Sequence, residues 1–353
     1  MNALDAELLD RIISRSLDIL RLSANEQRDV IVLVEKLQKD LTAKLSEGTL
    51  TDFGKARTQQ LLNEANALIA DYYSAMSGGL NTTLQQLAAL EARHTAEAVT
   101  SVLSAAEITA SLPTATVLKR LVSNVILEGS PLNDYWSKQA GDVAYRFAQQ
   151  VRMGIVAGES NADIIRRIVG TKDIAGVMDI SRRNVAALVQ TATLTVANTA
   201  RHETYMANKD IGIGEIWNST MDNLVCVRCG SRDGRVWDWN QQPIGHDIPY
   251  AVPALHISCR CALTMKLKPI TLDNGFVYEP GSWASTRASM DGQVSSKMTF
   301  EDWLNNRTPE QQDAQLGPGK AELFRQGKIG LEGMLNMKGE EMTLAQLKTK
   351  YGH

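Results

Sequence analysis

Apolar side chains near the start of the chain recur with the spacing of an α-helix. Between Leu4 and Leu22 they stand three or four positions apart, so they share one helix face. Ser23 and Glu26 then have the S-x-x-E form of a capping box, which predicts the start of a second helix. The apolar stripe of that helix ends at Glu47-Gly48.

A third apolar stripe runs from about Asp52 toward Leu103, with Gly78-Gly79 as its only strong breaker. Helices this long cannot bury an apolar face by themselves. Residues 1–128 are therefore predicted to form a long helical hairpin or bundle, and the same helices are candidates for an oligomer contact. A dedicated partner-binding arm is the second interpretation of this region.

In the next region, residues 129–270, the predicted helices are shorter and are separated by turn residues. Ser160 is predicted to begin the helix that holds Ile164–Val169, and Ser181 to cap a helix that continues through Arg201 to near Asn208. Arg201 and Glu203 are expected to form a surface ion pair or a cap at the end of that helix. We expect a helical core that carries a small module.

That module, at about residues 215–268, holds three tryptophans and every cysteine of the chain. Asp233-Gly234 is a two-residue hairpin signal, so the module should contain β-structure. The stretch from Asp273 to Ser296 resembles a linker. Short helices separated by proline and glycine are predicted from Phe300 onward, which makes residues 271–353 a linker and a small helical C-terminal region.

Composition supports a predominantly α fold. The chain has 353 residues, of which 44% are hydrophobic and only 5% aromatic, and strands would favour aromatic side chains. Its 37 basic and 40 acidic residues give a net charge of −3, which offers no general attraction to nucleic acid or to an anionic membrane. The acidic first ten residues do not resemble a secretory signal, and no apolar run is long enough to span a membrane. We therefore expect synthesis in the cytoplasm, with reduced thiols.

The four cysteines form two pairs. Cys226-x2-Cys229 is followed, after a loop, by His256-x2-Cys259-x-Cys261. Each short turn can place two soft ligands within reach of one ion, at about 2.3 Å for zinc and sulfur. The pattern predicts a structural Zn²⁺ held by four of these five residues. Arg260, between two cysteines, is expected to help keep both deprotonated.

Several alternatives stay open for this cluster. Cys226 and Cys229 belong to any metal shell, but spacing does not decide which two of His256, Cys259 and Cys261 complete it. Two disulfides, or four buried thiols, are the competing interpretations, and the cytoplasmic context favours zinc. Four protein ligands leave no open coordination position for water, so the site is expected to be structural and no catalytic residue is predicted.

The sequence contains only fragments of the motifs of zinc proteases, zinc deaminases and HNH nucleases. His202-Glu203 begins like the zinc-protease motif H-E-x-x-H, but Met206 replaces the second histidine. No histidine is followed two positions later by glutamate, as a zinc deaminase requires. His246, between the cysteine pairs, is weakly similar to the histidine of zinc-stapled HNH nucleases, although a polar loop role is favoured because the partner residues of that motif are missing.

Several motifs in the same order resemble the tailed-phage minor head, or head morphogenesis, proteins of the phage Mu type. The elements, in chain order, are Ala200-Arg201-His202-Glu203-Thr204, Trp217, Asp222, Cys226-x2-Cys229, Asp233-Gly234-Arg235-Val236 and Pro253-Ala254-Leu255-His256-x2-Cys259-Arg260-Cys261. The resemblance covers about residues 130–268. His202 replaces the usual threonine and Ala254 the usual second proline. The stretch FEDWLNNRTPEQQDAQLG also resembles a segment that follows this core in the family.

The resemblance implies a structural, non-enzymatic virion component present in few copies, inside the head or at the portal vertex. It implies a role in head assembly and in genome packaging or ejection. The implied partners are the portal protein and a major capsid or scaffolding protein. Packaged DNA is a further candidate, through Arg228, Arg232, Arg235 and Arg260, although nearby aspartates nearly cancel these charges. The alternative function is a zinc-stapled HNH-like nuclease or a phage-borne toxin-like effector.

Overall fold

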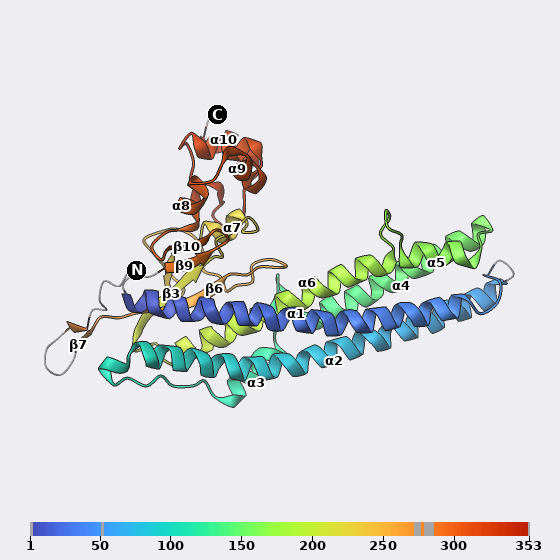
Figure 1. Cartoon of the computed structure of the whole chain (residues 1–353), viewed down its shortest axis with the longest axis horizontal. Coiled ribbons are helices and arrows are strands. Elements are labelled where there is room, and N and C mark those ends of the chain that lie inside the picture. Colours follow the sequence, from blue (N-terminus) through green and yellow to red (C-terminus); the bar gives the residue numbers. More distant parts are fainter. Residues whose placement is uncertain (1–2, 51–52, 272–276, 279–285, 352–353) are drawn as a thin grey trace. The chain divides into compact units, whose positions relative to one another are not determined.

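The computed structural model describes residues 3–50, 53–271, 277–278 and 286–351. Over these residues the chain is predominantly helical with small sheets, which confirms the predicted fold class (Figure 1). It divides into two compact units. One comprises residues 1–19, 87–121 and 194–353, and the other comprises residues 20–86 and 122–193. We call them the cysteine unit and the helical unit.

The helices differ greatly in length. The long ones are α1 (Ala3–Leu45), α2 (Lys55–Val102), α4 (Leu132–Ala157) and α6 (Val177–Met206). The short ones are α3 (Ala115–Ser123), α5 (Asn161–Val169), α7 (Val227–Gly230), α8 (Phe300–Asn305), α9 (Pro309–Leu316), α10 (Pro318–Arg325) and α11 (Leu344–Tyr351), with 3₁₀ turns η2 (Ser104–Ala106) and η3 (Glu332–Met334). None of the helices in the described part of the chain is both long and apolar enough to cross a membrane.

The first helix does not break where the capping box predicts. Ser23 lies inside α1, fully buried, and its hydroxyl accepts a hydrogen bond from the side chain of Gln27 at 3.2 Å. Ser23 is therefore a buried residue within α1 and not an N-cap. The predicted breaker Gly78-Gly79 also lies inside a helix, α2, where added Cβ atoms would meet nothing within 4 Å. Ser160 is confirmed as the N-cap of α5.

The helical unit is held by contacts between helices that are distant in sequence. Within it, segments of α1, α2, α4 and α6 run side by side (Figure 1). The hydroxyl of Tyr73 on α2 lies 2.8 Å from that of Ser181 on α6, and its ring meets Trp136 of α4 edge-on at 6.2 Å. Ser181 was expected to cap α6, but this helix begins at Val177 and the serine is buried inside it.

The cysteine unit contains a four-stranded antiparallel sheet in the order β5-β4-β3-β6. Its strands are β3 (Gly212–Asn218), β4 (Val236–Asp238), β5 (Pro243–Ile244) and β6 (Ala262–Leu267). Side chains from helices occupy the free edge of β6. Asn198 of α6 donates to the Cys261 carbonyl at 3.0 Å and accepts from Leu263 N at 3.2 Å, while Asp5 of α1 accepts from Leu267 N at 3.0 Å. This position of β6 fixes where the second cysteine pair lies.

Three charged side chains join the helices of the cysteine unit. Glu91 of α2 is fully buried and accepts hydrogen bonds from Arg15 of α1 at 2.8 Å and from Arg201 of α6 at 2.6 Å. Arg201 is only 1% exposed. The predicted surface role of Arg201 is therefore wrong, because the polar residue pattern of one helix does not reveal a carboxylate on another helix.

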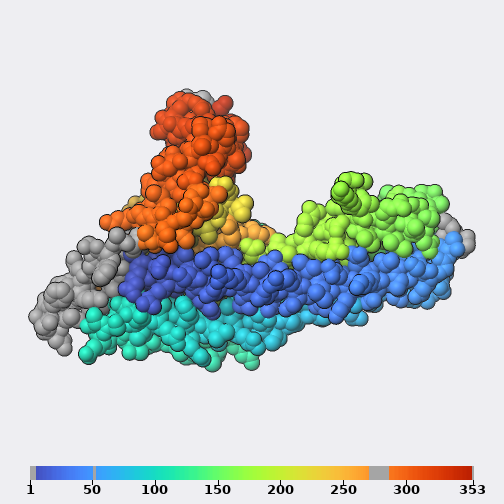
Figure 2. Space-filling model, in the orientation of Figure 1, coloured from blue at the N-terminus to red at the C-terminus, as the bar shows by residue number. Residues whose placement is uncertain are grey.

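The C-terminal helices share one apolar core with the cysteine-bearing segment. That core contains Cys229, Cys259 and Cys261 together with Phe300 and Leu331. Figure 2 shows the C-terminal residues, in orange and red, packed against the yellow segment that carries the cysteines. The C-terminal region is thus part of the same folded body as the sheet.

Part of the predicted linker is folded. Strands β9 (Thr286–Ser289) and β10 (Gly292–Ser295) form an antiparallel hairpin, and Arg287 is 2% exposed. The remaining short strands pair as β1 (Ile126–Leu127) with β2 (Ser130–Pro131) and β7 (Ile270–Thr271) with β8 (Val277–Tyr278). Residues 272–276 and 279–285 of the predicted linker lie outside the described residues. The predicted domain boundaries at 128 and 270 stay predictions.

Candidate metal centre

The first cysteine pair lies on a tight turn. Cys226 has extended backbone angles and precedes the short helix α7, and its carbonyl accepts hydrogen bonds from Cys229 N at 3.1 Å and Gly230 N at 2.9 Å. Gly230 is required by packing, because a Cβ there would lie 2.4 Å from Phe300 Cδ1. The turn is thus pressed against the C-terminal helix α8.

The second group of ligands lies on the loop that leads into β6. Cys259 N donates to the His256 carbonyl at 3.1 Å, which closes a turn around Ser258 with its positive φ of 64°. The Nδ1 atom of His256 lies 2.8 Å from the Ile257 carbonyl, so Nδ1 carries a hydrogen. The other ring nitrogen, Nε2, therefore faces the cysteines. This hydrogen bond orients the ring as a carbonyl does behind a metal-bound histidine.

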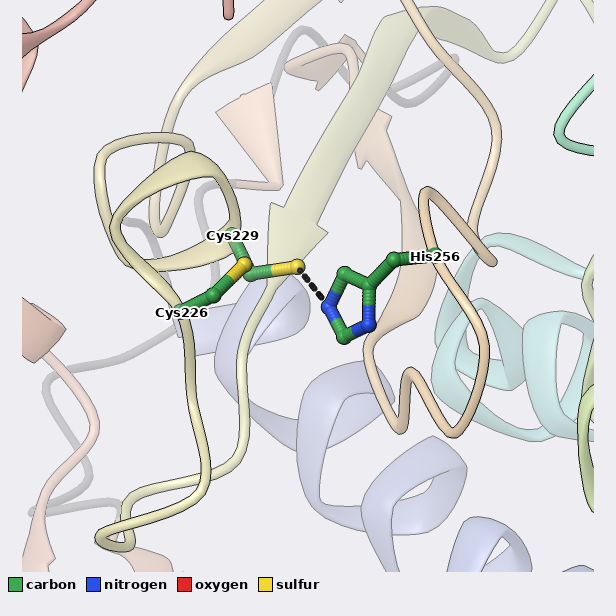
Figure 3. A group of neighbouring side chains, drawn as sticks. All are labelled: Cys226, Cys229 and His256. Atoms are coloured by element: carbon green, nitrogen blue, oxygen red, sulfur yellow. Dashed lines mark hydrogen bonds between the residues drawn. The ribbon is translucent and has the colours of Figure 1, made fainter. Parts of the chain in front are cut away.

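All five predicted ligands gather in one place. Their donor atoms form two groups, each within 4.8 Å: Cys226, Cys229 and His256 in one, and Cys229, Cys259 and Cys261 in the other. Cys229 belongs to both, with its sulfur 3.3 Å from His256 Nε2 and 3.8 Å from Cys259 Sγ. Figure 3 shows Cys229 and His256 pointing toward each other from separate segments. The four cysteines are free thiols, so the alternative of two disulfides is not adopted.

The four cysteines are shifted in opposite directions: the pKa of Cys226 and of Cys259 is lowered, whereas neighbouring sulfurs raise the pKa of Cys229 and burial raises the pKa of Cys261. Hydrogen bonds from Cys229 and His256 lower the pKa of Cys226 to about 4. The Cys226 and Cys259 sulfurs in turn raise the pKa of His256 to about 11. With this raised pKa, His256 carries a proton on Nε2, the ring nitrogen that faces the sulfurs. A metal cation that binds there displaces this proton. Buried and half-buried sulfur and imidazole donors at these separations can hold a metal ion, and they are the donor types that zinc prefers.

The Asp233-Gly234 dipeptide does not form the predicted hairpin turn. It lies in the turn after α7, and the strand that follows, β4, pairs with β3 and β5. The Asp233 carboxylate is instead buried and accepts hydrogen bonds from Ser219 N at 2.6 Å and Phe300 N at 2.8 Å. Asp233, which the sequence pattern placed in a hairpin turn, is therefore a buried hydrogen-bond acceptor.

His246 has no ring nitrogen left for a metal or for water. Its Nε2 donates to the Val236 carbonyl at 2.9 Å, and its Nδ1 accepts from Ile248 N at 3.2 Å. Burial lowers the pKa of His246, consistent with the neutral ring that these two bonds require. The geometry matches the polar loop role and not that of the nuclease histidine.

Three of the four arginines proposed for phosphate contact are paired with a carboxylate or buried. Arg260 makes two hydrogen bonds to Asp222, at 2.6 and 2.7 Å, so its charge is directed at a carboxylate instead of the neighbouring cysteines. Arg235 pairs with Glu332 at 2.6 Å, and Arg232 is 2% exposed. These three side chains do not form a free basic surface.

A second polar cluster was missed at the sequence level. His202 Nδ1 lies 3.0 Å from Glu215 Oε1, and the Tyr250 hydroxyl donates to Glu215 Oε2 at 2.6 Å. Glu215 is 2% exposed. The three residues come from α6, β3 and the loop before the second cysteine pair. The single histidine of α6, His202, is the sign of this cluster in the sequence.

Comparison with known proteins supports the resemblance that the motifs carry. Residues 146–264 match the sequence model of a family described as Phage Mu protein F like protein. The matched segment extends from α4 to β6 and includes all five candidate ligands. No curated protein and no solved structure is significantly similar to the chain.

Proposed function

We propose that this chain, whose residues 146–264 match the Phage Mu protein F like family, is a structural minor head protein of a tailed phage or prophage. It is present in few copies, inside the head or at the portal vertex. It acts in head assembly and in genome packaging or ejection. Its direct partners are the portal protein and a capsid or scaffolding protein.

The main support is that the matched segment contains the cysteine and histidine cluster, which fits a structural zinc site. All five candidate donors belong to it and lie in two overlapping groups. Four protein ligands around zinc leave no position for a reacting water, so the ion stabilises a fold instead of catalysing a reaction. The long helices α1 and α2 supply extended surfaces for partners, as an assembly protein requires.

Mass spectrometry of purified phage particles tests this function. Intact, nuclease-treated particles should yield peptides of the chain at a small fraction of the level of major capsid peptides. Particles emptied of DNA, compared with full ones, show whether the protein leaves with the genome. If the chain is absent from intact particles and from head assembly intermediates, the proposed function is wrong.

A nuclease assay addresses the alternative function. The purified protein should not cleave DNA in the presence of added Mg²⁺ or Mn²⁺, and His246→Ala should not change this, because both ring nitrogens of His246 already bond the backbone. Cleavage that depends on the metal and disappears in the His246 variant would support the nuclease instead.

A further inference from the structure

The second group of candidate ligands lies on an irregular part of the chain. His256, Cys259 and Cys261 belong to residues 245–261, a described stretch between β5 and β6 that contains no helix or strand. We call residues 250–261 the ligand segment. Donor atoms on a loop are placed less precisely than donors on a helix or strand unless other side chains hold the loop. The contacts at the two ends of the ligand segment therefore decide how well its donors face the first cysteine pair.

One helix holds the C-terminal end of the ligand segment. Asn198 of α6 is 1% exposed, and its side-chain amide donates to the Cys261 carbonyl at 3.0 Å and accepts from Leu263 N at 3.2 Å. The same amide donates to the Leu194 carbonyl at 3.0 Å, one turn earlier in α6, which fixes its orientation. The backbone at Cys261 is thus bonded to a buried side chain of the helix.

The next turn of the same helix holds the N-terminal end. His202 lies four residues after Asn198, and therefore on the same face of α6. Its Nδ1 lies 3.0 Å from Oε1 of Glu215, a buried residue of β3. Glu215 accepts a hydrogen bond from the Tyr250 hydroxyl at 2.6 Å, and that hydroxyl lies 3.2 Å from His202 Nδ1. Tyr250, the first residue of the ligand segment, is thus joined to α6 and to the sheet.

We propose that Asn198 and His202 are positioning residues of the metal centre, which hold the ligand segment at its two ends. His202 acts through Glu215 and Tyr250. A segment that is already held in place loses less conformational entropy when a metal binds, so the metal is bound more tightly. The inference rests on the structural metal site of the proposed function. It adds residues of a helix outside the cluster that control how tightly the metal is held.

Two quantities separate positioning from general stability. A residue that only stabilises the fold changes the unfolding free energy of the metal-free protein and leaves the metal affinity of the folded protein unchanged. A positioning residue changes the metal affinity itself. For each variant, zinc affinity is measured by competition with a chromogenic chelator, and the unfolding of the metal-free protein is measured in urea.

Tyr250→Phe tests the N-terminal end, because it removes a single hydroxyl group. We expect it to weaken zinc binding by about 10-fold, the lower end of the range found when outer partners of metal ligands are removed. Tyr72→Phe is the matched control. The Tyr72 hydroxyl also donates to a carboxylate at 2.6 Å, that of Asp40, but both residues belong to the helical unit. Equal zinc affinities in the two variants would overturn the proposal.

A double variant tests whether His202 acts through this contact. His202→Leu and Tyr250→Phe both interrupt the contact at Glu215, so the double variant should bind zinc little more weakly than the weaker single variant. Losses of affinity that add up in full would mean that His202 does not act through Tyr250.

Asn198→Ala tests the C-terminal end and should also weaken zinc binding by about 10-fold. Asn208→Ala is the matched control, because Asn208 is 5% exposed and bonds the backbone in the same way. Its side chain accepts from Ser111 N at 2.7 Å and donates to the carbonyls of Ser111 at 2.8 Å and Thr204 at 2.7 Å. Both variants leave buried backbone groups unpaired, and only Asn198→Ala should change the zinc affinity. A loss of affinity that is equal in the two would contradict the role of Asn198.

Hydrogen exchange gives a result even if an asparagine variant does not fold. In metal-free protein, Tyr250→Phe should speed exchange in the ligand segment relative to the wild type, whereas Tyr72→Phe should not. Unchanged exchange in Tyr250→Phe would overturn the proposal. If the wild-type protein binds no zinc, the metal site of the proposed function fails, while the exchange comparison still reports whether these contacts hold the segment.

Discussion

The Arg287 guanidinium makes hydrogen bonds of 2.9 and 3.1 Å to the two carboxylate oxygens of Asp233. The arginine side chain is 2% exposed and the aspartate side chain is fully buried. Asp233 also accepts from the backbone of Ser219 and of Phe300. One carboxylate therefore joins the end of β3, the hairpin β9–β10 and the start of α8 next to the cysteine turn.

The first prediction concerns this carboxylate. Asp233→Asn should lower the free energy of unfolding by about 3–5 kcal/mol, because it leaves the buried Arg287 without a counter-charge. Urea denaturation followed by tryptophan fluorescence measures the change. Asp291→Asn is the matched control, since the 48%-exposed Asp291 pairs with Arg307 near the surface and should cost about 0–1 kcal/mol. Equal costs for the two variants would mean that Asp233 does not hold the C-terminal region.

The second prediction concerns the ion pairs among the helices of the cysteine unit. Glu91→Gln removes the charge that Arg201 and Arg15 share, and Arg201 is 1% exposed. We expect a loss of about 3–5 kcal/mol in thermal or urea unfolding. Glu64→Gln, which breaks the more exposed pair with Lys44, should change the stability much less, because solvent screens an exposed ion pair. A loss below about 1 kcal/mol in Glu91→Gln would show that the buried cluster is not a stability determinant.

The third prediction is a pH dependence with a defined sign. Burial lowers the pKa of His202, but the hydrogen bond and charge of Glu215 outweigh it and leave this pKa raised. The folded protein then binds a proton more tightly than the unfolded chain, whose histidine has a pKa of about 6.5. The stability due to His202 is therefore fully present below that value and is lost as the pH rises through the raised pKa.

Unfolding free energies from about pH 5 to 9 check this prediction, because the ordinary histidine pKa of about 6.5 lies inside this range and the two shifted histidines lie on either side of it. The difference between wild type and His202→Gln should be largest at low pH and shrink at high pH. His246→Gln is a control of opposite sign: the pKa of His246 is lowered by burial, so its contribution falls as the pH decreases. A His202 difference that grows with pH would contradict the pairing with Glu215.

The fourth prediction concerns chelation. Because Phe300 and Leu331 pack in the same core as Cys229, removal of the metal should loosen residues 286–351 together with the segment 212–267. Hydrogen exchange with and without a chelator should show faster exchange in both segments and unchanged exchange in α2 between residues 61 and 80. Loosening confined to residues 212–267 would mean that the C-terminal helices fold independently of the metal.

The sequence predicted those features that depend on residues close together in the chain. The apolar stripes of α1 and α2, the cap at Ser160 and the spacing of the cysteines all depend on near neighbours in sequence, and each has its place in the structure. Ser23 misled because a serine followed by a glutamate three residues later can also occur within a helix, where burial against other helices outweighs a cap.

Contacts between distant segments were not predictable in this way. Glu91 and Arg201 are 110 positions apart, and Asp233 and Arg287 are 54 apart. The sequence around one residue of a pair therefore does not indicate its partner. Arg232 resembles a surface arginine in sequence. Its burial depends on Trp217 and on Gly339, which only the folded chain brings to it.

Metal content tests the structural zinc site most directly. Protein purified without added metal should contain close to one zinc per chain by elemental analysis, and Cys226→Ser should contain none. Iron in place of zinc, or a metal-free protein that keeps its fold and four free thiols, would contradict a structural zinc site in this chain.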